Sequence, residues 1–114
     1  NRIIDVFPAN QQGQVRTQLS FVLEAVFCQQ LLPLSNGRGR ILCAEVMVTN
    51  EAIKAMIRDD KAHQIYSAIQ TGARQSMCTM NQAIQVLYKS GRITYDTALG
   101  HSMDPDDLKR LLSR

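Results

Sequence analysis

The sequence lacks a long hydrophobic run. No stretch of its 114 residues approaches the roughly 20 consecutive apolar residues of a membrane-spanning helix, and no segment has the pattern of a secretory signal peptide. We therefore expect a soluble chain that does not insert into a membrane. Hydrophobic residues nevertheless make up 45% of the sequence and recur throughout, which indicates a folded core and excludes a disordered segment.

The sequence also lacks the clusters that bind metal ions. Its three cysteines, Cys28, Cys43 and Cys78, are widely spaced and include no CxxC pair. Neither His63 nor His101 has a histidine, cysteine or acidic partner at ligand spacing. We therefore expect no metal site, and three reduced, buried thiols.

A nucleotide-binding motif and a catalytic constellation are absent as well. The chain contains no Walker A sequence, and the glycine-bearing turn at residues 35–39 precedes a strand instead of a helix. Cys78 and His63 lack an orienting acid, so a nucleophile–base pair between them is a coincidence of composition. The sequence therefore predicts no catalytic residue and no cofactor-binding residue within this segment.

The basic residues do not gather into a nucleic-acid face. The net charge of +3 comes from 13 lysines and arginines against 10 aspartates and glutamates. The basic residues are scattered, Arg38/Arg40 and Lys109/Arg110 are only pairs, and no aromatic residues alternate with them. We therefore expect no nucleic-acid partner.

The first half predicts one helix and a hairpin. Apolar residues at helical spacing, after a start near Asn10, predict a long amphipathic helix that ends before Pro33. The residues of this pattern are Val15, Leu19, Val22, Leu23, Val26, Phe27 and Leu31. Two strands, at residues 31–34 and 40–48, are expected on either side of the Asn-Gly turn.

The second half predicts a compact bundle of short capped helices. Thr49 is expected to cap a helix over 50–58, and Asp59 or Asp60 the next helix, whose buried stripe is Ile65, Tyr66 and Ile69. Three further start signals are a capping box from Thr79 to Gln82, a cap at Thr94, and Asp104 followed by Pro105. The predicted fold class is therefore α/β but mostly α.

The helix over 50–58 has two distinct sides. Its apolar arc consists of Ala52, Ile53, Met56 and Ile57. Lys54 and Arg58 lie one turn apart along the edge of this arc, where Glu51 and Asp59 neutralise them only in part. Two readings stay open: an ordinary solvated edge, or a basic edge that meets an acidic partner surface.

Several motifs, in order, resemble those of a known family. They are RIIDVFP at 2–8, QQLLP at 29–33, AIKAMIRD at 52–59, HQIYSAIQTG at 63–72 and TMNQA at 79–83. Together they resemble the type II/type IV secretion-system ATPases, and within them the ATPases that retract type IV pili in twitching motility. The resemblance covers essentially the whole chain.

The resemblance is most informative at the retraction motif, which this family usually writes AIRNLIRE. Ala52, Ile53, Ile57 and Arg58 agree with that motif. The departures are Lys54, Ala55, Met56 and Asp59, where the family has Arg, Asn, Leu and Glu. The resemblance assigns a coupling role, linked to retraction and not to ATP turnover, to Ala52, Ile53, Lys54, Ile57 and Arg58.

The resemblance implies a C-terminal fragment of a hexameric, cytoplasmic motor that acts at the inner membrane through the pilus platform proteins. Residues 1–48 are expected to end a RecA-like ATPase core, and residues 49–114 to form a helical C-terminal domain. The P-loop, the Walker B acid, the catalytic glutamate and the histidine box lie upstream in this family, so ATP and Mg²⁺ are expected in the parent protein and not on this segment alone.

A second hypothesis treats the segment as a non-catalytic module that docks on a neighbouring subunit through Ile53, Met56 and Ile57. A third and weaker one is an extension or secretion ATPase. Those relatives typically carry a four-cysteine zinc site, which three scattered cysteines do not make.

Overall fold

The computed structural model of the chain describes residues 2–113, apart from the side chains of Arg2 and Arg74. The elements are α1 (Arg2–Asp5), α2 (Ala9–Val22), β1 (Ala25–Pro33), β2 (Arg40–Val48), α3 (Glu51–Arg58), α4 (Ile65–Gln70), α5 (Met80–Lys89), α6 (Tyr95–His101) and α7 (Pro105–Leu112), with 3₁₀ turns η1 (Ala62–Gln64) and η2 (Ala73–Gln75). The prediction of an α/β chain that is mostly α is confirmed.

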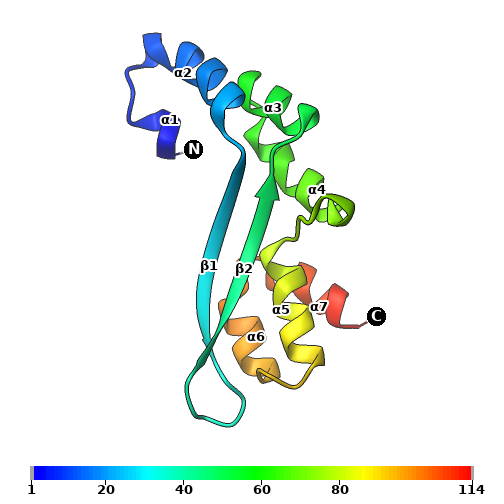
Figure 1. Ribbon diagram of the computed structural model, residues 1–114. Helices are drawn as coiled ribbons and strands as arrows, with labels where there is room; N and C mark the ends of the chain where they lie inside the picture. The colour runs from blue at the N-terminus through cyan, green and yellow to red at the C-terminus, as the bar shows by residue number, and fades with distance from the viewer. Residues whose placement is uncertain (1, 114) are drawn as a thin grey trace.

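A long β-hairpin connects the two groups of helices (Figure 1). β1 and β2 pair antiparallel over nine residues each, from Ala25 opposite Val48 to Pro33 opposite Arg40. The turn between them uses Gly37 at a φ of 74°, a conformation that glycine adopts without strain. The helices lie in two groups, α2 to α4 at the open end of the hairpin and α5 to α7 beside its turn end.

The long helix is predicted to continue to just before Pro33, and this prediction is wrong beyond Val22, where α2 ends. The backbone leaves the helix at Leu23, which has an extended conformation, and residues from Ala25 onward form β1. Helical spacing cannot detect the nine-residue partner strand, whose ladder hydrogen bonds override the local pattern. The helix also begins at Ala9, before the expected start at Asn10, and no described side chain caps it.

The core beside the hairpin turn is named here the tip cluster. It consists of Leu32, Cys43, Ile84, Ile93, Ala98 and Leu108. The predicted caps are confirmed at the helices that build it: Thr79 and Gln82 form a reciprocal capping box, and Thr94 and Asp104 cap α6 and α7. Each cap side chain accepts one N–H of the first turn of its helix, and Glu45 of β2 accepts a further one, the Met80 N–H of α5.

The core at the open end is named here the base cluster. It consists of Met47, Ile53, Ile57, Ile69 and Met77, with partly buried Leu19, Leu23, Val26 and Val48 around them. The helices after residue 48 therefore do not form one bundle, since they pack in two groups against the hairpin. The domain boundary at residue 48 stays a prediction.

Two predicted helix starts are wrong at this end. Asn50, and not Thr49, caps α3 by accepting a hydrogen bond from the Ile53 N–H at 2.8 Å. Thr49 instead donates its hydroxyl to the carbonyls of Leu23 and Glu24, just before β1. Neither Asp59 nor Asp60 begins α4, because the 3₁₀ turn η1 precedes that helix.

Candidate functional site

The helix α3 is held to the body of the molecule by one face. Ile53 is 0% exposed and Ile57 is buried one turn later, both in the base cluster. The expected apolar arc is only partly correct, because Ala52 is exposed and Met56 is partly buried. The buried pair fixes how α3 rotates about its axis, and therefore which of its side chains reach solvent.

Lys54 and Arg58 lie at the surface, each beside one carboxylate. The Lys54 ammonium is 3.9 Å from Glu51, and the Arg58 guanidinium is 3.8 Å from Asp59. Such long, solvent-exposed pairs contribute about 0–1 kcal/mol. The predicted partial neutralisation of this edge is confirmed.

The turn after α3 anchors the C-terminal end of the helix. Asp60 adopts a φ of 57°, and its carboxylate lies 3.3 Å from the Arg16 guanidinium on α2. The Lys61 N–H donates to the Met56 carbonyl at 2.7 Å. α2 and α3 are therefore joined both by apolar packing and by an ion pair, which favours their movement as one unit.

The predicted docking face of Ile53, Met56 and Ile57 is wrong. Two of its three members are buried inside the chain, where no partner can touch them without unfolding α3. The same burial gives Ile53 and Ile57 a structural role, the positioning of Lys54 and Arg58.

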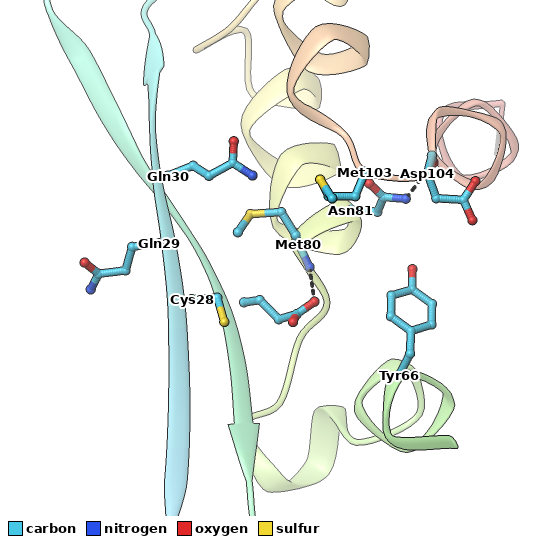
Figure 2. Close-up of a pocket in the computed structure, with 9 residues that line it drawn as sticks. Cys28, Gln29, Gln30, Tyr66, Met80, Asn81, Met103 and Asp104 are labelled. Atoms are coloured by element: carbon cyan, nitrogen blue, oxygen red, sulfur yellow. Dashed lines mark hydrogen bonds between the residues drawn. The ribbon is translucent and has the colours of Figure 1, made fainter. Parts of the chain in front are cut away.

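A cavity of about 460 Å³ lies between the hairpin and the helices, and sequence reasoning missed it. Its lining comes from both strands, α4, α5 and the segment before α7: Cys28, Gln29, Gln30, Glu45, Tyr66, Met80, Asn81, Met103 and Asp104 (Figure 2). These residues are scattered over the sequence. Only the hairpin register, which places Cys28 opposite Glu45, brings two of them together from local signals.

Asn81 is the centre of a polar network beside this cavity. It is 4% exposed and donates to the Asp104 carbonyl at 3.1 Å and to Asp107 Oδ2 at 2.9 Å. Its own carbonyl accepts the Ser102 hydroxyl at 2.6 Å. An amide with its donors and acceptor all engaged is rigid, so this wall of the cavity is preorganised.

Asp107 connects three helices through one carboxylate. Besides Asn81 of α5 it accepts the Tyr66 hydroxyl of α4 at 3.0 Å and pairs with Arg110 of its own helix. The hydrogen bond from Asn81, followed by that from Arg110, holds the Asp107 pKa below its ordinary value. Burial, and then the bond to Asp107, raises the Tyr66 pKa, although the Tyr66 side chain is 39% exposed and not buried as predicted.

The three cysteines are free thiols in three different environments. Cys28 is exposed, which corrects the prediction that all three are buried. Cys43 is buried in the tip cluster, and this burial, with a smaller effect of nearby Cys78, raises its pKa to about 11. Within residues 2–113 no group of three His, Cys, Asp or Glu side chains could hold a metal ion, and no helix is long and apolar enough to cross a membrane.

Comparisons with known proteins agree on one group of relatives. A twitching motility protein of Neisseria gonorrhoeae is 38% identical over 108 residues, which are 95% of this chain and 29% of that protein. The type IV pilus ATPase PilU of Pseudomonas aeruginosa is 37% identical over 111 residues, 97% of this chain and 29% of that protein.

The fold agrees with a solved structure of the same kind. A crystal structure of the pilus retraction motor PilT with bound ADP matches with a TM-score of 0.84 and 46% identity, over 96% of this chain and 30% of that one. No protein-family model matches the chain. The chain thus spans about 30% of the length of these relatives.

Proposed function

Because the chain belongs to the family of type IV pilus retraction ATPases and corresponds to their C-terminal part, we propose that it couples nucleotide-driven motion to pilus disassembly. The parent protein in this proposal is a hexameric, cytoplasmic ATPase that uses ATP and Mg²⁺ and acts on the inner-membrane platform of the pilus. The ADP in the related motor structure supports nucleotide binding by the parent.

The observation that carries the proposal is the way α3 is mounted. Ile53 and Ile57 are buried in the base cluster, which includes Met47 of β2 and Leu19 of α2, and the Arg16–Asp60 ion pair ties the end of α3 to α2. A displacement of the hairpin or α2 is therefore passed to the exposed edge with Lys54 and Arg58. That edge is available to an acidic surface, because its own ion pairs are long and weak, although the Lys54 side chain is only 33% exposed.

Two departures from the family motif lie on this helix. Lys54 keeps the positive charge of arginine but lacks the planar fork that binds a carboxylate at two points. Ala55 lacks the donor and acceptor of asparagine. We infer that the edge meets its partner mainly through charge, so its contact weakens with added salt.

The exposed apolar side chains support the proposed assignment of residues 1–48 to the end of an ATPase core. Phe27, Leu31 and Leu42 lie on the face of the hairpin opposite the helices and are at least half exposed. α2 exposes Phe21 and Val22 beside an apolar recess of about 530 Å³, which Ile3 of α1 also lines. We propose that the preceding part of the motor covers these side chains.

Removal of the basic edge tests the coupling role. In the full-length protein, Lys54→Ala with Arg58→Ala is expected to abolish twitching motility and to leave ATP turnover within about twofold of the unchanged protein, since buried Ile53 and Ile57 still hold α3 in place. Arg92→Ala with Lys109→Ala is the matched control, because it removes the same charge from two exposed residues near the tip cluster. Normal motility of the Lys54/Arg58 variant contradicts the coupling role.

The second candidate function is that of a subunit-docking module. Because Ile53 and Ile57 are buried, we assign its docking surface to the exposed apolar face of the hairpin. Static light scattering of the 114-residue chain over a range of concentrations distinguishes it, because docking through Phe27 and Leu31 predicts a mass that rises with concentration. A chain that stays monomeric at high concentration gives this function no support. In that case the same face is left for the preceding part of the motor.

A further inference from the structure

The fold brings together two turns that are far apart in the sequence. They are named here the basic turns, and they consist of residues 35–40 in the hairpin turn and residues 89–92 at the end of α5. The Ser35 N–H donates to the Arg92 carbonyl at 2.8 Å, and the Ser35 hydroxyl donates at 2.7 Å to the carbonyl of Gly91, which lies 56 residues further along the chain. Arg38 and Arg40, which are only a pair in the sequence, therefore share one end of the molecule with Arg92.

The basic turns are exposed, cationic and without apolar side chains. Every residue in them is exposed, and each is a serine, an asparagine, a glycine or one of the four cations Arg38, Arg40, Lys89 and Arg92. Within the part of the chain that the structure describes, no carboxylate pairs with the guanidinium of Arg38, Arg40 or Arg92. Asp96, the acid nearest to Arg92 along the chain, is exposed in the first turn of α6 and does not pair with it. The positive charge of this surface is therefore not neutralised by the neighbouring helix.

The basic turns lie at one extreme of an elongated molecule. The chain extends 50 Å along its longest axis and 27 Å and 23 Å along the other two. The hairpin turn and the turn after α5 both lie at the end away from α2 and α3 (Figure 1). Hydrogen bonds from the Leu34 N–H to the Gly39 carbonyl, at 3.1 Å, and from the Gly37 N–H to the Leu34 carbonyl, at 3.0 Å, close the hairpin turn. A closed turn at a protruding end can present its cations to a flat surface.

The chemistry of this surface selects the partner. The core of a protein interface consists of apolar and aromatic side chains, which the basic turns lack. Single-stranded nucleic acids stack their bases on rows of exposed rings. The two aromatic residues that flank residues 89–92, Tyr88 and Tyr95, instead pack edge-on against each other, with 5.8 Å between the ring centroids. A bilayer with anionic lipids needs no such anchor, because its phosphates attract arginine and lysine through charge.

We propose that the basic turns contact the headgroups of an anionic lipid bilayer without inserting into it. Since these turns carry no apolar side chain, their attraction to the bilayer depends on charge and falls as the salt concentration rises. Each arginine near an anionic membrane surface strengthens binding about fivefold. The proposal concerns where the protein binds, so it does not depend on the coupling role of α3.

Sedimentation with lipid vesicles tests this contact. Full-length protein is mixed with vesicles of phosphatidylcholine that contain about one third phosphatidylglycerol, which is anionic, or with vesicles of phosphatidylcholine alone. At an ionic strength of about 0.1 M, we expect at least about tenfold stronger binding to the anionic vesicles, and we expect this preference to disappear at about 1 M salt. Equal binding to both kinds of vesicle at the lower salt concentration overturns the proposal.

Substitutions then locate the contact. Arg38→Gln with Arg40→Gln is expected to weaken binding to the anionic vesicles about 25-fold, whereas Arg38→Lys with Arg40→Lys keeps both charges and is expected to bind like the unchanged protein. Lys61→Gln with Lys109→Gln removes the same charge from two exposed residues outside the basic turns, and is expected to change binding less than about twofold. Circular dichroism checks the fold of each variant. An equal loss in the glutamine variants of the arginine and lysine pairs shows that binding follows net charge alone, and the proposal is then wrong.

The single removal of Arg92 gives an intermediate effect. Arg92→Ala with Lys109→Ala, the control for motility above, leaves three of the four charges of the basic turns. It is expected to weaken vesicle binding about fivefold and not to abolish it.

Competitors distinguish lipid from other polyanions. A single-stranded oligonucleotide of about 16 nucleotides and a poly-glutamate peptide are titrated into the mixture of protein and anionic vesicles. Both are expected to bind more weakly than the vesicles. Tighter binding of either competitor that is lost in Arg38→Gln with Arg40→Gln assigns the basic turns to nucleic acid or to an acidic protein, and overturns the lipid partner.

Discussion

The two ends of the hairpin differ in how completely the helices packed there are capped by side chains. At the tip cluster every helix has a side-chain cap, and Asn81 and Asp107 join the segments around it through hydrogen bonds. At the base cluster no described side chain caps α2, and Phe21 and Val22 face solvent. The helices at the tip are therefore better secured at their N-termini, although both ends expose apolar side chains, Leu31 and Leu42 at the tip and Phe21 and Val22 at the base. α3, which carries the proposed coupling residues, packs at the base.

The largest effects are expected from cavities in the two cores. Ile84→Ala in the tip cluster and Ile53→Ala in the base cluster each remove three carbons from a fully buried side chain, at a cost of about 2–5 kcal/mol. Hydrogen exchange is expected to show the loss of protection in α5 to α7 for Ile84→Ala and in α2 and α3 for Ile53→Ala. Ile84→Val is the mild control, at about 0.5–1.5 kcal/mol.

Equal loss of protection at both ends in either variant would show that the hairpin and all the helices unfold as one unit. In that case the tip and the base do not differ in local stability. Loss confined to one end supports movement of α2 and α3 together, independently of the helices at the tip, as the proposed coupling role requires.

The next effect concerns the polar network at the tip. Asp107→Asn removes the charge that strengthens the bonds from Asn81, Tyr66 and Arg110, and is expected to cost about 1–3 kcal/mol of unfolding free energy at pH 7. Asp106→Asn, in the same first turn of α7 but exposed, is the matched control and is expected to cost less than about 0.5 kcal/mol.

The cost of Asp107→Asn also depends on pH. The folded protein holds the Asp107 pKa below its ordinary value, so its carboxylate stabilises the fold fully above the pKa of the unfolded chain. That stabilisation is lost as the pH falls through the lower pKa of the folded state. Denaturation of both proteins at pH 7 and under acidic conditions is therefore expected to show a difference that shrinks in acid, and a constant difference would contradict the role of the charge.

Helix caps give a smaller effect at both ends. Thr79→Ala removes half of the capping box at α5, and Asn50→Ala removes the only described side-chain cap of α3, at about 0.5–2 kcal/mol each. We expect the larger loss for Thr79, because its side chain is buried and leaves an unsatisfied space. Thr79→Ser and Asn50→Asp keep the cap and are expected to restore most of the stability. Should Asn50→Ala be the costlier change, α3 is less secured by packing than its buried isoleucines indicate.

Sequence reasoning was most successful where the signal is local. The capping box, the caps at Thr94 and Asp104, and the Asn-Gly turn all lie within a few residues, and all of them are confirmed. It failed at residues 23–31, where helical spacing of apolar residues coincided with a strand whose partner lies further along the chain, from Val48 opposite Ala25 to Leu42 opposite Leu31. It also missed the cavity, since lining residues such as Glu45, Tyr66 and Asp104 surround it only after the hairpin and the helices are packed.

The smallest effect decides between the two readings of the basic edge. Glu51→Gln with Asp59→Asn removes both acids that face Lys54 and Arg58, and is expected to change the unfolding free energy by less than about 1 kcal/mol, because both pairs are long and exposed. The same change leaves the two cations free, so an acidic partner surface is met with equal or greater strength and motility in the full-length protein is expected to persist. If stability falls by more than about 2 kcal/mol while motility is lost, the pairs hold α3 together and the edge is structural. If motility falls at unchanged stability, the partner instead contacts the acidic side chains of Glu51 and Asp59. The partner surface is then basic, and the proposed acidic surface is wrong.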